Sequence, residues 1–252
     1  MITIAGWRVP MSASLLVWAV LWEIVGRLGL VFLLPPLSEV IAAGIVMVQT
    51  STWQAATLVS AQAFLVGMTA AILVGVPLGV AMGRLPFVDR LLGMWVDLFV
   101  SAPLTALVPI LMILFGFGQT TVVVTVFLFA VWIIALDTRA GVRQVPPSLV
   151  EMGRCYGASP VQLLVKVILK AALPEILAGI RLGVIRGVKG VVIGQLLVAI
   201  IGYGELFELY SRGFAMARFW PLTLILFAMA MLLSALVEAA EKRVEFYAGV
   251  RS

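Results

Sequence analysis

Six long stretches of almost uninterrupted apolar residues constrain the fold of this 252-residue chain most strongly. A helix needs about 20 mainly apolar residues to cross about 30 Å of hydrocarbon, because it rises about 1.5 Å per residue. The stretches lack the alternating apolar and polar pattern of membrane strands. The sequence therefore predicts an all-α, polytopic membrane protein with about six transmembrane helices, at residues 12–34, 55–82, 91–115, 121–136, 176–201 and 219–240.

The composition argues against a soluble protein and against an enzyme. Hydrophobic residues make up 63% of the chain and charged residues 12%, whereas soluble domains have about 25% charged residues. There is no histidine and one cysteine, Cys155, so neither a disulfide within the chain nor a zinc or haem site is expected. No Gly-x-x-x-x-Gly-Lys-Ser/Thr loop is present to hold nucleotide phosphates. We expect no bound cofactor, no metal and no catalytic site.

Basic residues are concentrated in the loops on one side of the predicted bundle. Positive loops face the cytoplasm, and if both termini lie there, only Arg212 and Arg218 are placed in outside loops. The formal charge of +5 then reflects membrane topology rather than nucleic-acid binding. We predict that both termini and residues 137–174 are cytoplasmic. The inside residues are Arg8, Arg84, Arg90, Arg139, Arg143, Arg154, Lys166, Lys170, Lys242, Arg243 and Arg251.

Residues 137–174 form a polar, amphipathic segment between the fourth and fifth apolar stretches. The Pro-Pro-Ser sequence at 146–148 predicts a helix start, and Gly157 predicts the left-handed turn that ends this helix. Ser159, followed by a proline, predicts the cap of a second helix. Connectors in helical bundles usually have about 2–8 residues. The segment could be a solvated connector, but its length and order favour a docking element for a cytoplasmic partner.

These residues resemble the "EAA" loop of permease subunits of ATP-binding cassette importers. The resemblance rests on Glu151, on the run Gly157-Ala158-Ser159 and on residues 167–174. From about residue 12 to 245 the chain is similar to the nitrate/sulfonate/taurine branch of that family. It departs from the usual pattern at Met152, Gly153, Lys170, Gln119 and Gln195. Further motifs that carry the likeness are residues 21–23, 34–40, 75–79, 102–109, 115–118, 141–143 and 202–204.

The resemblance implies a function and a set of partners. In that family, a short helix of the loop lies in a groove of the nucleotide-binding subunit and couples its closure to movement of the spanning helices. Carried over, Glu151, Gly157, Ala158 and Ser159 would be the coupling residues. The chain would be one permease domain, residues 1–252 with a core at about 55–240, in the bacterial inner membrane.

The same resemblance implies an assembly around the chain. It would form a homodimer, bind two subunits that carry ATP and Mg²⁺, and receive its solute from an extracytoplasmic binding protein. Two other classes stay open. An ion-coupled secondary transporter could use Glu23, Asp97 or Lys189 as coupling charge, although a long internal repeat is lacking. A membrane scaffold without transport activity is the third.

Charges in the fifth apolar stretch predict the transport path. A charged group at mid-membrane costs on the order of 2.5–3.5 kcal/mol on insertion scales and usually faces protein or water. We predict that Arg186, Lys189 and Gln195 line the path and that its positive field favours an anionic or strongly polar solute. The alternative is that Arg181 extends to the cytoplasmic surface and Arg186 pairs with a carboxylate such as Asp97.

Small residues and one charged pair have structural interpretations. Glycines at four-residue spacing predict close helix packing. Glu23 and Arg27 are four residues apart and predict an intrahelical ion pair. Ser38 predicts the cap of an amphipathic helix that follows the first span. The stretches 103–109 and 116–118 predict kinks or gates. The glycines are Gly75, Gly79, Gly83, Gly179, Gly183, Gly187, Gly190 and Gly194.

Overall fold

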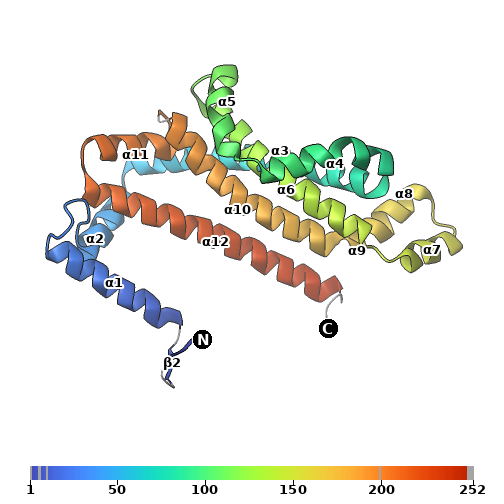
Figure 1. Cartoon of the computed structure of the whole chain (residues 1–252), viewed down its shortest axis with the longest axis horizontal. Coiled ribbons are helices and arrows are strands. Elements are labelled where there is room, and N and C mark those ends of the chain that lie inside the picture. The colour runs from blue at the N-terminus through green and yellow to red at the C-terminus, as the bar shows by residue number, and fades with distance from the viewer. Residues whose placement is uncertain (1, 5–6, 10, 199, 249–252) are drawn as a thin grey trace.

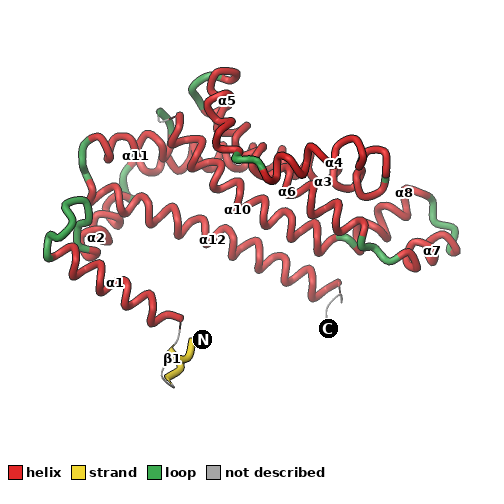
Figure 2. The backbone as a smooth tube through the Cα atoms, viewed as in Figure 1, coloured by secondary structure: helices red, strands yellow, loops and turns green. Residues whose placement is uncertain are grey.

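The computed structural model describes residues 2–4, 7–9, 11–198 and 200–248, and these are almost entirely helical (Figures 1 and 2). The predicted all-α class is confirmed; a short antiparallel hairpin of β1 (Ile2–Ile4) and β2 (Trp7–Val9) precedes the first helix. The helices in chain order are α1 (Met11–Arg27), α2 (Leu37–Met47), α3 (Ser51–Arg84), α4 (Pro86–Ser101), the 3-10 helix η1 (Leu104–Leu107), α5 (Val108–Phe115), α6 (Gln119–Arg143), α7 (Pro147–Cys155), α8 (Pro160–Gln162), the π-helical η2 (Leu163–Ile168), α9 (Leu169–Ala171), α10 (Leu173–Val198), α11 (Gly202–Arg212) and α12 (Met216–Ala248).

Within the described ranges, three helices are long and apolar enough to cross a membrane, namely α3, α6 and α12. The count rises to five if α4 with η1 and α5, and α10 with α11, each form one bent span. The predicted first span is shorter than expected. Helix α1 has 17 residues, which at about 1.5 Å per residue give about 26 Å.

Two predicted spans have different boundaries in the structure. Residues 91–115 are not one helix, because the chain bends by 96° between Ser101 and Leu104. Pro103 explains the bend: it has no backbone N–H, and its ring disfavours the helical conformation of the residue before it. The predicted span 121–136 is longer and continues to Arg143. The first seven residues of the polar segment 137–174 therefore belong to α6.

Glycines place α6 between α3 and α10. A Cβ atom on Gly79 of α3 would lie 2.5 Å from the carbonyl oxygen of Ala135, and one on Gly183 of α10 would lie 2.7 Å from Ile134 Cγ1. The predicted close packing is confirmed, and it occurs within one chain. Figure 1 shows α12 running along α10, with α7 to α9 at one end of the molecule and α2 and α11 at the other.

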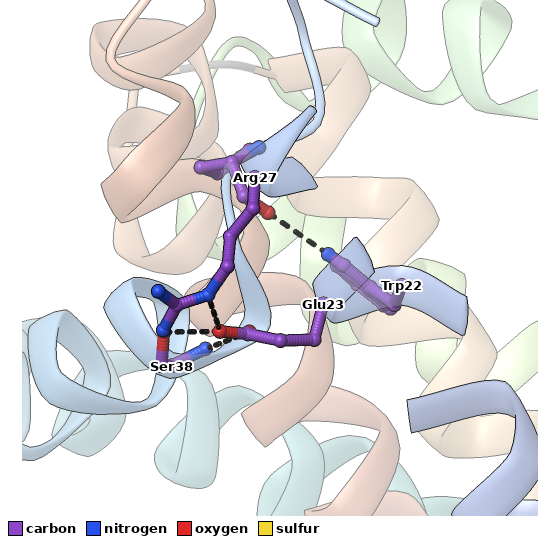
Figure 3. A network of polar contacts seen from close by, with 5 residues as sticks. Trp22, Glu23, Arg27 and Ser38 are labelled. Atoms are coloured by element: carbon purple, nitrogen blue, oxygen red, sulfur yellow. Dashed lines mark hydrogen bonds and ion pairs between the residues drawn. The ribbon is translucent and has the colours of Figure 1, made fainter. Parts of the chain in front are cut away.

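Polar contacts tie α1 to the start of α2 (Figure 3). The predicted Glu23–Arg27 pair is confirmed at 2.6 Å. Glu23 also accepts hydrogen bonds of 2.9 Å from the backbone N–H and the hydroxyl of Ser38. The prediction that Ser38 caps this helix was wrong, because α2 begins at Leu37 after Pro36. The carboxylate instead satisfies a first-turn N–H that has no partner within the helix. Trp22 adds a bond to the Pro35 carbonyl at 3.0 Å.

We predict that Gly79→Ala lowers the thermal stability of the purified protein in detergent. The new methyl group would meet the backbone of α6, so the helices must move apart, and overpacking of this kind costs about 1–3 kcal/mol. Gly118→Ala is the matched control, because Gly118 has an extended backbone and no neighbour within 4 Å of the point where the added methyl group would lie. Equal melting temperatures for the two variants would contradict the packing argument.

Candidate functional site

Helix α7 is defined by local signals at both ends. It begins at Pro147 after Pro146, which confirms the start predicted at 146–148, and no side-chain hydrogen bond caps this end. Gly157 has φ +74, which confirms the predicted left-handed turn. Its N–H donates to the Arg154 carbonyl at 2.9 Å, and the N–H of Ala158 donates to the Gly153 carbonyl at 3.0 Å. These two bonds satisfy carbonyls that the helix end would leave free.

The next helical turn begins at a capping box. Ser159 Oγ accepts from the Gln162 N–H at 3.3 Å, and Gln162 Oε1 accepts from the Ser159 N–H at 2.9 Å. The predicted cap at Ser159 is therefore confirmed. The single helix expected after it consists of α8, the π-helical η2 and α9 in succession. Caps on both sides fix the path of residues 156–160, and the structure brings Gly157, Ala158 and Ser159 together at the C-terminal end of α7.

The outer surface of α7 mixes charge with exposed apolar groups. Glu151, Arg154 and Cys155 are exposed, and Met152 and Tyr156 are 51% and 86% exposed. The inner side is closed, since a Cβ on Gly153 would lie 2.6 Å from Leu163 Cδ2. Exposed apolar side chains beside a carboxylate and a guanidinium are typical of a docking surface. We call the exposed residues 151, 152 and 154–156 the α7 surface.

An ion-pair cluster joins α4 to the end of α6, just before α7. Asp89 Oδ1 lies 2.6 Å from Arg139 Nε, and its other oxygen contacts Arg143. Asp97 lies 3.7 Å from Arg139. Asp89 was not singled out from the sequence, although a carboxylate at the edge of an apolar stretch signals a need for a cation. This cluster holds the α6 terminus from which the chain leaves toward α7.

Gln195 is completely buried, at the opposite end of α10 from the loop. Its Nε2 donates to Ser60 Oγ of α3 at 2.9 Å, and its Oε1 accepts from the Tyr203 N–H of α11 at 3.1 Å. Gly202 and Gly204 make room for it, because Cβ atoms there would lie 2.4 Å from Gln195 Nε2 and 1.9 Å from the Gln195 carbonyl oxygen. The side chain thus fixes the 52° bend between α10 and α11.

Arg186 and Lys189 of α10 lie on a different side of the helix from Gln195. Leu182, Lys189 and Leu196 are exposed and follow each other at seven-residue spacing, so they form one stripe. Arg186 lies beside this stripe and donates to the Val100 carbonyl at 3.5 Å. The alternative pairing of Arg186 with Asp97 is not found, since Asp97 contacts Arg139. We call the three exposed residues together with the neighbouring Arg186 (182, 186, 189 and 196) the α10 stripe.

Comparison with known proteins identifies the family. Residues 71–246 match the family described as "Binding-protein-dependent transport system inner membrane component". The chain belongs to this family. The taurine transport system permease protein TauC of Escherichia coli (strain K12) is 32% identical, with 82% of this chain and 80% of that protein covered. The glycine betaine/proline betaine permease protein ProW of the same organism is 33% identical, but the match spans 53% of its length.

A solved structure shares the fold. A chain from an inward-facing structure of the MetNI methionine ABC transporter is 21% identical and superimposes with a TM-score of 0.62, covering 74% of this chain and 93% of that chain. The family match and the relatives make the protein a multi-pass inner-membrane permease subunit of the ABC importer class. Such subunits are not enzymes, and the ATPase is a separate subunit.

We predict that Gln195→Met destabilises the protein by about 1–3 kcal/mol, because the buried Tyr203 N–H loses its acceptor. The two side chains have similar size, so the loss is polar rather than steric. Gln119→Met is the matched control, since Gln119 is exposed and makes one long bond of 3.4 Å to Gln62. Thermal unfolding followed by tryptophan fluorescence measures both variants; a control as unstable as Gln195→Met would refute the specific role.

Proposed function

We propose that the α7 surface is where this permease couples to its ATPase, and that the chain works as a homodimer importing a small polar solute that bears an anionic group. The observation that supports coupling best is the α7 surface itself. It presents Met152 and Tyr156 beside Glu151, outside the apolar bundle. Apolar side chains exposed to water in this way are explained by a protein partner.

The proposed coupling residues have distinct tasks. Glu151 supplies a carboxylate on the α7 surface, and Gly157 supplies the left-handed elbow. The Ala158 N–H closes the end of α7, and the Ser159 hydroxyl caps the start of α8, so both ends of the short link between these helices are held by hydrogen bonds. A displacement of α7 by the ATPase would therefore be transmitted to α10 through short, hydrogen-bonded helical segments rather than through a flexible loop. ATP and Mg²⁺ would be held by the partner subunit.

The proposed orientation places α7 and both termini in the cytoplasm. Figure 1 shows the end of α12 on the same end of the molecule as α7 to α9. The basic residues of the α6 end and of residues 154–170 also lie at this end, which agrees with the preference of positive loops for the cytoplasm. The opposite end, with α2 and α11, would then face the binding protein that delivers the solute.

The proposed solute class follows from charge and from relatives. Arg186 and Lys189 give the accessible side of α10 a positive field. The relatives TauC and ProW are named for taurine and for glycine betaine, both of which carry an anionic group. Gln195, the third predicted path residue, is buried between helices in this structure, so it would reach a path only after α10 and α11 move apart.

We predict that Glu151→Lys weakens complex formation with the cognate ATPase subunit and lowers ATP hydrolysis by the reconstituted transporter by about tenfold or more, since reversing an interface charge costs on the order of 1–3 kcal/mol. Glu39→Lys makes the same charge change on exposed α2 at the opposite end. Co-purification and phosphate release measure both effects. If Glu39→Lys impairs binding and ATP hydrolysis as much as Glu151→Lys does, the assignment of the α7 surface is wrong. Uptake that needs a proton gradient instead of ATP would favour an ion-coupled transporter.

A further inference from the structure

The break between α4 and η1 leaves backbone groups without their helical partners. The Phe99 carbonyl would accept from residue 103, but Pro103 has no N–H. The Val100 carbonyl would accept from Leu104, whose N–H donates to Ala102 instead at 2.9 Å. Pro103 itself, with φ −73 and ψ 81, forms a tight turn at this point. The apolar segment 91–115 therefore contains free backbone acceptors.

Lipid cannot cover such a break. Unsatisfied backbone groups cost several kcal/mol in hydrocarbon, so irregular backbone at membrane depth lies against protein or lines a water-filled cavity. Figure 2 shows the loop between α4 and α5 near the middle of the long axis of the molecule, not at an end. Ser101, Pro103, Thr105 and Ala106 are exposed there. Something other than lipid must therefore face residues 101–106.

One residue of the α10 stripe, Arg186, contacts the break from the other side. Arg186 Nη1 donates to the orphaned Val100 carbonyl at 3.5 Å, which takes up one of the five N–H donors of its guanidinium group. Asp137 of α6 attracts Arg186 electrostatically from the inner side of α10. The Cβ of Asp137 packs against Gly179 of α10. Within the described part of the chain, Lys189 has no ion-pair partner. The stripe therefore carries cationic charge that is only partly balanced.

A second copy of the chain packed tightly over the α10 stripe and residues 101–106 would not satisfy the free backbone acceptors and the cations. In a two-fold dimer the same patch meets itself, so the α10 stripe would place Arg186 and Lys189 against their own copies, and like charges in contact are costly. The stripe contains no carboxylate to offset them. A hydrated gap accommodates both the free backbone acceptors and the charges.

We infer that the break at residues 101–106 and the α10 stripe together form the solute contact of the transport path, a water-filled site that selects for an anionic group. The inference rests on the proposed homodimeric importer and narrows it. Arg186 binds the anion with the donors that Val100 leaves free, Lys189 adds charge beside it, and Ser101 and Thr105 supply hydroxyl groups. Gln195 is not part of this site.

Thiol labelling tests the inference without knowledge of the natural solute. In a Cys155→Ser background, which removes the single native cysteine, Thr105→Cys is placed in lipid nanodiscs, where both sides are accessible. It is treated with methanethiosulfonate reagents that carry either an anionic sulfonate or a cationic trimethylammonium group. Because the thiolate is the reactive species, a thiol in water is labelled and a thiol in lipid is not. Leu73→Cys, exposed on α3, is the lipid-facing control, and Ser101→Cys is a second reporter.

We predict rapid labelling of Thr105→Cys and little labelling of Leu73→Cys, with rates measured by mass spectrometry and normalised to a free thiol. The anionic reagent should be favoured, and Arg186→Gln should reduce the ratio of anionic to cationic rates by about three- to tenfold, because one nearby charge is removed. Arg90→Gln, on an exposed residue near the start of α4, removes the same charge elsewhere and should leave the ratio unchanged.

The outcomes separate this inference from the proposed function. Unreactive thiols at both 101 and 105 would show that the break is covered, and the inference fails. Labelling with no preference for the anionic reagent, or a preference that survives Arg186→Gln, would overturn the anion assignment. In either case a preparation that still binds its ATPase through the α7 surface leaves the proposed function intact. Binding of the ATPase subunit to the Cys155→Ser chain is measured in a separate experiment, because Cys155 itself lies on the α7 surface.

Discussion

The close approach of α3, α6 and α10 determines most of what this chain presents to its surroundings. Apolar side chains gain little from burial against each other in lipid, so van der Waals contact between closely packed helices must hold them together. Glycines on α3 and α10 provide that contact by letting the backbone of α6 come near on both sides. The rotation of α10 about its own axis is thereby fixed. Gln195 then faces α3, and the α10 stripe lies on a side that no helix of the described chain covers completely.

The membrane also determines where irregular backbone can occur. The two bends have different solutions to the same problem. At the α10–α11 bend, Gln195 and Tyr203 satisfy each other inside the protein, and two glycines admit them. At the α4–η1 bend, the described contacts include one long bond from Arg186 and leave hydroxyl-bearing residues outside. A neutral amide suits the first site because the site is enclosed by protein, and a cation suits the second if, as we propose, that site borders water.

Local features were predicted well from the sequence. The left-handed turn at Gly157, the cap at Ser159 and the Glu23–Arg27 pair each depend on residues within four positions of one another. The glycine spacing also predicted packing, because a four-residue repeat defines one helix face. Ser38 failed because a carboxylate 15 residues away competes for its groups. The stretch 103–109 was predicted to kink the helix over 91–115, and the chain does break at Pro103, but the 96° angle depends on neighbouring segments and could not be predicted.

Contacts between distant segments could not be predicted. Gln195 meets Ser60 across 135 residues, and nothing near either residue indicates the other. Arg186 and Gln195 were predicted to share one path because both are polar groups in the same apolar stretch, although nine residues at about 100° each place them on opposite sides of the helix. The structure separates them: α3 and α11 enclose the Gln195 amide, whereas the Arg186 guanidinium belongs to the α10 stripe on the opposite side of the helix. A mid-membrane polar group is therefore informative about function only once its covering helix is known, and on α10 that criterion leaves Arg186 and Lys189, not Gln195, as the residues we propose for solute contact.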